Sequence, residues 1–219
     1  MIICSNQISK EVKVSVIICS YNRPETISKT IDSIIEQKCN FPYEIIIGDD
    51  KSTEDVREIL LSYQKKYPKQ IILLFHEKNI GLGANWASCI KISRGEYIAG
   101  CDNDDFWHNK DKLRLQVEFL EKNPEYGMVH TDYIELNRKT QVQISKIIHT
   151  ISYKGPLIKV IFNGNFKCCN SSVMYRRLVI IEHVFLNDYI SFQFPLQDWY
   201  TWVSISKYTK FHCLPFSTT

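Results

Sequence analysis

The sequence has few of the features that mark secreted, membrane-spanning or zinc-binding proteins. Its eight cysteines include no CxxC pair and no spacing typical of zinc ligands, so a structural zinc site is not expected. The N-terminus lacks the apolar core and the cleavage site of a signal peptide. No apolar run approaches the roughly 18 residues needed to cross a bilayer. We therefore expect a chain that works in a reducing, cytosolic compartment.

A strong excess of charge is also missing. The formal net charge of +3 and the isoelectric point near 8.3 are too mild to indicate a nucleic-acid-binding protein. They are compatible with an anionic substrate or with a loose association with a membrane surface. The 219 residues contain no low-complexity segment, internal repeat or linker, and this length suits one mid-sized domain. Residues 1–219 are therefore expected to form a single domain.

Short apolar runs alternate with amphipathic segments through the first half of the chain. Strands are predicted over residues 14–19, 44–48, 71–75 and 97–101, with helical spacing of apolar residues between them. Nearly continuous apolar strands are typical of a parallel sheet that is covered on both faces. The order predicts an α/β fold with a mostly parallel central sheet, right-handed crossovers and flanking helices. Residues 1–13 are expected to be a polar, frayed lead-in.

The second half shows a less regular pattern. Helices are predicted over 112–122 and 156–162. Another helix is expected to follow the strand at 171–175 and to end near Asn187, and a last one to start at Asp198. Strands are predicted over 127–132, 171–175 and 211–214. Residues 135–154 are polar and without clear periodicity, so a loop or a hairpin is expected there.

Polar side chains follow several strands of the predicted sheet. Ligands of such sheets bind beyond the carboxyl ends of the strands, and these ends read Ser20-Tyr21-Asn22, Asp49-Asp50 and Asp102-Asn103-Asp104-Asp105. Side chains alternate along an extended chain, so Asp102 and Asp104 should point to the same side. Carboxylates that close repel each other unless a cation lies between them, and hard oxygen ligands suit Mn²⁺ or Mg²⁺. The pattern favours a metal–diphosphate site; the alternative is an acidic surface turn that caps the next helix.

Five stretches, taken together, resemble a known enzyme family. They are Val14–Asn22, Gly48–Thr53, Asn79–Ala84, Gly95–Trp107 and Gln197-Asp198-Trp199. In this order they are similar to the inverting family 2 glycosyltransferases with the A-type (GT-A) fold. The likeness extends to bacterial members that act on capsule, lipopolysaccharide or other envelope glycans. It implies a single Rossmann-like GT-A domain, with a nucleotide-sugar-binding half over 14–107 and an acceptor-binding half over 108–219.

The resemblance implies roles for individual residues. Asp50 matches the position that accepts a hydrogen bond from the nucleotide base. A carboxylate only accepts, so it suits the imide N–H of uracil or thymine, or the edge of guanine, and not the acceptor edge of adenine. Asp104 matches the metal ligand of the Asp-x-Asp motif, with Asp102 as a ribose contact or a further metal partner. The ion would be Mn²⁺ or Mg²⁺. Further nucleotide contacts are expected from Ser20, Tyr21, Asn22, Asn79 and Asn103.

The same residues allow structural alternatives. Asp49 and Asp50 can instead cap the helix that follows them, and Tyr21 can be a packing residue. The stretch from Asn79 can be a plain turn into a helix. Lys51 departs from the glycine that the family usually has at this position.

Asp198 matches the catalytic base of the family. Inverting transfer needs one carboxylate that takes the proton of the acceptor hydroxyl while the oxygen attacks the anomeric carbon. Asp198 stands at the head of a predicted helix, where an aspartate is also a good N-cap. The sequence leaves both interpretations open.

The sequence thus predicts a metal-dependent inverting glycosyltransferase that moves a sugar from a nucleoside diphosphate sugar, UDP above all, to an acceptor hydroxyl. The acceptor would be a glycan or lipid-linked glycan of cell-surface polysaccharide biosynthesis, reached in the cytoplasm or at the inner face of the membrane. The alternatives are a non-catalytic nucleotide-sugar-binding domain of the same fold and a nucleotidyltransferase. The Gly-rich, Arg-containing loop of nucleotidyltransferases is missing after the first strand, and no GxGxxG indicates a dinucleotide-binding dehydrogenase.

Overall fold

Apolar runs rich in isoleucine and valine form the centre of the fold. The computed structural model describes residues 1–3, 11–137, 140, 143–147, 157–162, 166, 168–192 and 197–219. The strands are β1 (Ile2–Ile3), β2 (Val14–Ser20), β3 (Tyr43–Asp49), β4 (Ile71–Phe75), β5 (Tyr97–Gly100), β6 (Tyr126–Leu136), β7 (Gln143–Ile147), β8 (Met174–Arg176) and β9 (Lys210–Ser217). The helices are α1 (Ile27–Ile35), α2 (Glu54–Lys66), α3 (Leu82–Ile92), α4 (Lys112–Lys122), α5 (Leu157–Phe162), α6 (Arg177–His183), α7 (Leu186–Phe192) and α8 (Gln197–Ile205), with a 3₁₀ turn η1 (Asn170–Ser172).

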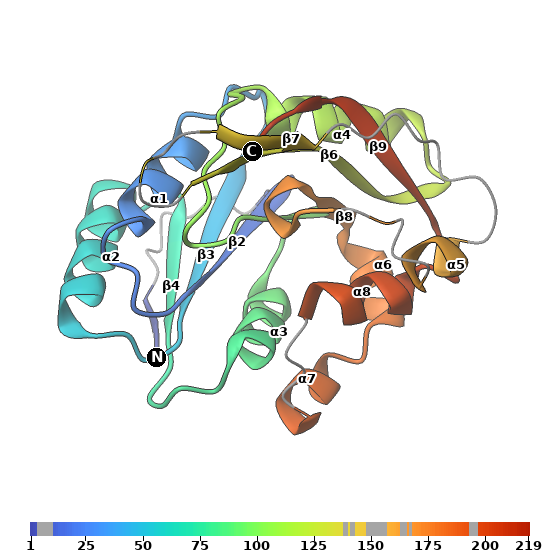
Figure 1. Ribbon diagram of the computed structural model, residues 1–219. Coiled ribbons are helices and arrows are strands. Elements are labelled where there is room, and N and C mark those ends of the chain that lie inside the picture. The colour runs from blue at the N-terminus through green and yellow to red at the C-terminus, as the bar shows by residue number, and fades with distance from the viewer. Residues whose placement is uncertain are drawn as a thin grey trace.

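Within the described residues these strands form one mixed sheet, flanked by helices on both faces (Figure 1). Its order is β1-β4-β3-β2-β5-β8-β6-β7, and β9 pairs with β6. β2 lies parallel to both β3 and β5, and β3 lies parallel to β4, whereas β8 runs antiparallel to β5 and β6. The predicted α/β fold with a parallel centre is therefore confirmed.

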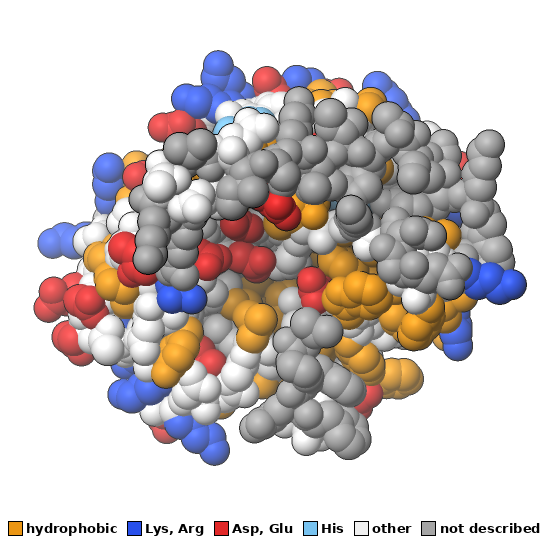
Figure 2. Space-filling view, in the orientation of Figure 1, with side chains coloured by type: hydrophobic (Ala, Val, Ile, Leu, Met, Phe, Trp, Pro, Cys, Tyr) orange, Lys and Arg blue, Asp and Glu red, His pale blue; other side chains and the backbone are white. Residues whose placement is uncertain are grey.

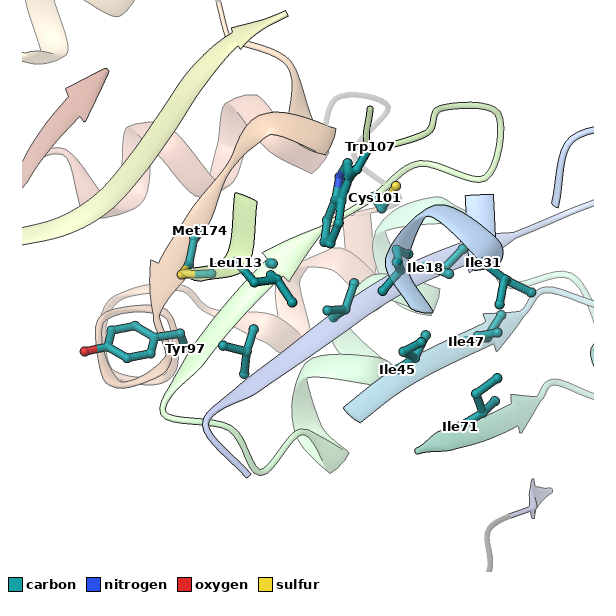
Figure 3. Close-up of a cluster of buried hydrophobic side chains, with 14 of the residues drawn as sticks. Ile18, Ile31, Ile45, Ile47, Ile71, Tyr97, Cys101, Trp107, Leu113 and Met174 are labelled. Atoms are coloured by element: carbon teal, nitrogen blue, oxygen red, sulfur yellow. The ribbon is translucent and has the colours of Figure 1, made fainter. Parts of the chain in front are cut away.

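Alternate residues of the central strands enter two separate apolar layers. Along β3, Ile45 and Ile47 belong to the layer under α1, α2 and α4, and Figure 3 shows them with Ile31 of α1 and Leu113 of α4. Ile46 packs against α3 on the other face. The three isoleucine side chains of β3 are fully buried, and burial of one such side chain contributes about 1.5–3 kcal/mol. The second layer also holds α8 through Trp202, so the helix that carries Asp198 is fixed to the sheet by its apolar face.

Several predicted elements need correction. Ile2 and Ile3 are not part of a frayed lead-in, because they pair with β4 as an edge strand; residues 4–10 of that lead-in lie outside the described residues. The strand expected over 171–175 begins only at Met174 and follows the 3₁₀ turn η1. The single helix expected up to Asn187 is two helices, α6 and α7.

The polar stretch after β6 forms a hairpin where it is described, since β7 pairs antiparallel with β6. Residues 138–139, 141–142 and 148–154 of this stretch lie outside the described residues. Among the helices of the described chain, none combines the length and the apolar character that crossing a bilayer requires. The seven cysteines in the described ranges all carry free thiols.

Candidate active site

The strand ends that carry polar residues meet at one edge of the sheet. β2 is hydrogen-bonded to β3 on one side and to β5 on the other, so Ser20 lies beside Asp49 and the acidic loop after Gly100 follows next to them. The Asp50 amide donates to the Ser20 carbonyl at 2.9 Å, which continues the pairing past the strand end. Figure 2 shows acidic side chains gathered around a hollow on this face.

Asp50 holds the loop that precedes α3. Its Oδ1 accepts from the Ile80 amide at 2.7 Å and its Oδ2 from the Gly81 amide at 2.9 Å, and the residue is 3% exposed. Both partners of Asp50 lie before α3, so the Asp50 carboxylate does not cap α2. A carboxylate offers about four lone-pair sites, so an oxygen of Asp50 can accept one more donor. Its contact with a nucleotide base stays a prediction.

The loops after β2 and β3 are tied to each other by Asn22. The Thr53 amide donates to Asn22 Oδ1 at 2.9 Å, and the Asn22 amide donates to the Ser52 hydroxyl at 3.1 Å. Asn22 has φ 49° and Lys51 has φ 64°, so both residues lie in the left-handed region. The Asn22 side chain is therefore already engaged in shaping the loops beside which the nucleotide is predicted to bind.

The other predicted nucleotide contacts differ in exposure. Tyr21 is 49% exposed and Asn79 lies on the surface of the Asp50-bound loop, so both are open to a ligand. The Ser20 side chain is fully buried, and its hydroxyl has no hydrogen-bond partner within the described part of the chain. Ser20 can therefore serve a nucleotide only through the position of its backbone. Asn103 has its carbonyl bound by the Thr26 hydroxyl at 2.7 Å.

The acidic loop is held by a segment that the sequence analysis did not single out. Asn170 Nδ2 donates to Asp102 Oδ1 at 2.8 Å, and the Asp102 amide donates to Ser171 Oγ at 2.9 Å. Ser171 Oγ in turn donates to Asp105 Oδ2 at 2.5 Å. Asp105 therefore ties the acidic loop to this segment. Asp104, unlike Asp102 and Asp105, is not held by this segment. Its side chain is 40% exposed, and the nearest described cation is Arg23, with Nε 3.9 Å from Asp104 Oδ2.

The carboxylates of the loop repel each other. Burial, followed by the charge of Asp105 and then those of Asp104 and Asp198, raises the pKa of Asp102 to about 7. The hydrogen bond from Asn170 lowers this pKa and offsets part of the rise. Burial and the charge of Asp104 also raise the pKa of Asp105. The influence of Asp198 on Asp102 shows that the end of α8 and the acidic loop, far apart in sequence, lie within electrostatic range of each other.

The donor set suits a divalent cation that is completed by a ligand. No group of three or more His, Cys, Asp or Glu side chains is close enough to hold an ion within the described ranges. Mg²⁺ and similar hard ions usually take one or two carboxylates and obtain their other oxygens from phosphates and water. The exposed Asp104 and the neighbouring Asp102 repel each other, and a cation bound between them would offset that repulsion. The pair therefore fits this pattern.

Asp198 lies in the first turn of α8. Its Oδ1 accepts from the Trp199 amide at 2.8 Å, while burial raises the pKa of the carboxyl group. The helix is fixed in place because Trp202 Nε1 donates to Tyr175 Oη at 2.8 Å and the Tyr189 hydroxyl donates to the Gln197 carbonyl at 3.0 Å. A raised pKa suits a proton acceptor, so the role of Asp198 as the base stays a prediction. α8 begins at Gln197, and Asp198 accepts from the amide of the next residue, whereas an N-cap accepts from an amide two or three residues on.

Two halves of the site meet at Cys19, near the end of β2. A hydrogen bond with Cys89 and burial raise the pKa of its thiol, and the charges of Asp102 and Asp50 raise it further. The position predicted to bind the base and the position predicted to bind the diphosphate therefore lie on either side of one strand end.

Comparison with known proteins identifies the family. The model of the family described as Glycosyl transferase family 2 matches residues 15–184, most of the chain. The chain belongs to glycosyltransferase family 2. This confirms the predicted family and, with it, the class of enzyme.

Curated relatives of this family 2 chain are longer than it is. The poly(ribitol-phosphate) beta-glucosyltransferase of Bacillus spizizenii is 32% identical over 164 residues, which cover 68% of this chain and 26% of that enzyme. An uncharacterized protein of Mycobacterium tuberculosis is 38% identical over 111 residues, which cover 51% of this chain and 32% of that protein. The chain thus spans about a third or less of these relatives.

Solved structures confirm the GT-A-like fold. TarS 1–349 of S. aureus in complex with UDP-GlcNAc has a TM-score of 0.67 at 18% identity, covering 94% of this chain and 57% of that one. The mannosyltransferase PcManGT of Pyrobaculum calidifontis, in complex with GDP-Man and Mn²⁺, has a TM-score of 0.66 at 17% identity, covering 94% and 56%. At identities below 20%, these structural similarities are evidence of a shared fold alone.

Proposed function

We propose that this family 2 chain transfers a sugar from a UDP-sugar to an acceptor hydroxyl, with inversion at the anomeric carbon and with the help of Mn²⁺ or Mg²⁺. One observation carries the proposal: at the carboxyl ends of the parallel strands, Asp104 has a side chain that is 40% exposed, in the same loop as Asp102, whose carboxylate Asn170 holds at 2.8 Å. The charge of Asp198, in the first turn of α8, contributes to the raised pKa of Asp102, which supports a place for this fourth carboxylate near the acidic loop.

The donor nucleotide lies across the ends of β2 and β3 in this proposal. Asp50 accepts the imide N–H of uracil, because its carboxylate cannot donate to the acceptor nitrogen that adenine presents. Tyr21 and Asn79 are exposed on the two loops that flank Asp50 and contact the base or the ribose. Complexes of the structurally similar TarS with UDP and UDP-GlcNAc support uridine as the base.

Asp104 and Asp102 are the residues that would hold the divalent cation, with its remaining oxygen ligands supplied by the diphosphate and water. The ion, when bound, acts as a Lewis acid on the departing diphosphate. Asp104 is exposed and would bind the ion directly, whereas Asp102 has one oxygen committed to Asn170 and offers the other. The Mn²⁺ complex of PcManGT supports a metal in a domain of this fold.

Asp198 takes the proton of the acceptor hydroxyl as the acceptor oxygen attacks the anomeric carbon. The bond to the new oxygen forms while the bond to the diphosphate breaks, and attack opposite the leaving group inverts the centre. Burial raises the pKa of Asp198, which brings a carboxylate closer to the range where it is an effective base. An α-linked donor thus yields a β-glycoside, as in the reaction for which the Bacillus relative is named.

The acceptor is a hydroxyl-bearing polymer or lipid-linked glycan of the cell envelope, used in the cytoplasm or at the inner face of the membrane. The poly(ribitol-phosphate) acceptor in the name of the Bacillus relative and the free thiols of the described residues support these assignments. A non-catalytic nucleotide-sugar-binding domain is the second candidate, favoured by the Trp199 amide, which occupies one oxygen of Asp198.

A thermal-shift screen tests the donor and metal assignments. We expect UDP with Mn²⁺ to raise the melting temperature more than GDP, TDP or CMP with Mn²⁺, and more than UDP with a chelator. Ligand at about a hundred times its dissociation constant adds roughly 2.7 kcal/mol to the free energy of unfolding. Asp104→Asn should remove the part that depends on Mn²⁺. An equal shift for UDP with chelator in the wild type would contradict the metal site.

A further inference from the structure

The 3₁₀ turn η1 reaches the acidic loop from the other half of the chain. Asn170 donates to Asp102 Oδ1 at 2.8 Å, and Ser171 Oγ accepts from the Asp102 amide at 2.9 Å while it donates to Asp105 Oδ2 at 2.5 Å. Two neighbouring residues thus touch the carboxylates on either side of Asp104. Among the described residues, η1 makes no hydrogen bond to Asp104 itself.

The turn is held rigidly from below by buried polar side chains. Trp107 Nε1 donates to the Ser171 carbonyl at 2.8 Å, and Gln116 Nε2 donates to the Ser172 carbonyl at 2.8 Å. Trp107 is 3% exposed and Gln116 is fully buried. A buried donor that lost its carbonyl would incur the full desolvation penalty, so η1 has little freedom to move.

The end of β5 is shaped to receive this turn. A Cβ placed on Gly100 would lie 2.8 Å from the Asn170 carbonyl oxygen, which is closer than real Cβ atoms come to such an atom. Glycine therefore allows η1 to pack directly against the strand that leads into the acidic loop. The loop, the strand end and the turn form one packed unit.

We propose that Asn170 and Ser171 are the positioning residues of the cation site. They fix one oxygen of Asp102 and one of Asp105, so that the remaining Asp102 oxygen and the exposed Asp104 face the diphosphate together. Hydrogen bonds from the protein to ligating carboxylates orient those ligands, and their loss typically costs 10–100-fold in metal affinity. This inference rests on the proposed function, because it assumes that Asp104 and Asp102 bind the ion.

Mn²⁺ binding in the presence of saturating UDP tests the role of η1. Electron paramagnetic resonance of free Mn²⁺ gives the dissociation constant without any need for turnover. We expect Asn170→Ala and Ser171→Ala to raise this constant about tenfold or more. Both variants should bind UDP in the presence of chelator as the wild type does, because the base pocket around Asp50 is untouched.

Ser172→Ala is the matched control. Ser172 belongs to the same turn and is buried, but its hydroxyl donates to the Cys169 carbonyl at 2.7 Å and contacts neither carboxylate. It should lose stability without losing Mn²⁺ affinity. Asn170 is partly exposed, so its alanine variant offers a soluble test even where Ser171→Ala fails to fold.

The outcomes separate the two claims. Wild-type protein that binds no Mn²⁺ with UDP would overturn the proposed metal site itself. Wild-type protein that binds Mn²⁺, with Asn170→Ala and Ser171→Ala within twofold of it, would overturn only the role of η1. An equal loss of affinity in Ser172→Ala would also overturn it, because general loosening of the turn would then explain the effect.

Discussion

Asp49 and Asp50 are neighbours in sequence, and their carboxylates are used in different ways. Asp49 is fully buried and accepts from Arg57 Nε at 2.8 Å and from the Ser52 amide at 3.3 Å. Asp50 binds the amides of Ile80 and Gly81 at the edge of the proposed base pocket. Asp49 thus ties β3 to α2, and Asp50 connects the strand end to the nucleotide loop.

The residue after this pair is Lys51, where the family usually has glycine, but its backbone keeps a conformation that glycine favours. Its φ of 64° lies in the left-handed region, where a glycine meets no Cβ penalty and other residues lose roughly 1–2 kcal/mol. The loop therefore keeps a conformation that suits glycine even though lysine occupies the position.

Lys51→Gly should stabilise the fold. Relief of the left-handed strain outweighs the extra chain entropy of glycine, roughly 0.5–1 kcal/mol, and leaves a net gain of about 0.5–1 kcal/mol. Urea denaturation measures it. Asn22→Gly is the control, since Asn22 is also left-handed but its Oδ1 binds the Thr53 amide, so this variant should lose stability. A destabilised Lys51→Gly would contradict the strain argument.

At the scale of elements, the contact between β5 and η1 joins the two halves of the domain. The strand ends at Gly100, against the Asn170 carbonyl, and the acidic loop begins immediately after it. A shift of either element would therefore move Asp102.

Gly100→Ala should lower both stability and Mn²⁺ affinity. The new Cβ would lie 2.8 Å from a backbone oxygen, so η1 must move, and overpacking of this kind costs about 1–3 kcal/mol. Gly83→Ala is the control: its Cβ would meet the Tyr189 ring at 2.8 Å, away from the acidic loop. It should lower stability while Mn²⁺ binding with UDP stays at the wild-type level. Unchanged Mn²⁺ binding in Gly100→Ala would contradict the proposed coupling.

The strands of the first half could be predicted because their residues carry the information locally. Ile45, Ile46 and Ile47 are buried on both faces of the sheet, and a short apolar run between polar turns is the direct sign of that burial. The order of such runs then determined the parallel arrangement and placed Asp50 and Asp102 at one edge.

The turn η1 could not be predicted in the same way. Its defining contacts join Asn170 and Ser171 to residues more than sixty positions earlier in the chain. The run from Cys168 to Ser172 has no periodicity of apolar residues, and the strand pattern that begins at Val173 extended the predicted strand too far back. Only the packing of β8 beside β5 brings this run to the acidic loop.

At the scale of the whole molecule, one buried cation links folding to pH. Lys112 is fully buried, its Nζ donates to Gln116 Oε1 at 2.7 Å and lies 4.3 Å from the centre of the Trp107 ring. Burial lowers the pKa of this ammonium group from 10.5 to about 7. Lys112 therefore releases its proton in the folded protein far more readily than in the unfolded chain.

Stability should rise with pH between about 7 and 10.5 through this group. In that range the unfolded chain binds more protons than the folded one, so the free energy of unfolding increases with pH; below about 7 both states are protonated and the gain is absent. Lys112→Met should flatten the rise, measured by urea denaturation at pH 7, 8 and 9. Lys110→Met, at an exposed lysine paired with Glu36, should leave the slope unchanged. Equal slopes for wild type and Lys112→Met would contradict the prediction.

The central claim is that Asp198 serves as the base of an inverting transfer, and the Asp198→Asn variant tests it most directly. Asparagine keeps the size and a capping oxygen, so α8 should survive and UDP–Mn²⁺ affinity should stay near wild type. The measurement is the initial rate of sugar transfer, at saturating UDP-sugar, to an acceptor that the wild-type protein uses. We expect it to fall by about 10²–10⁴, the usual contribution of a positioned base. An Asp198→Asn variant that transfers sugar at the wild-type rate would contradict the account.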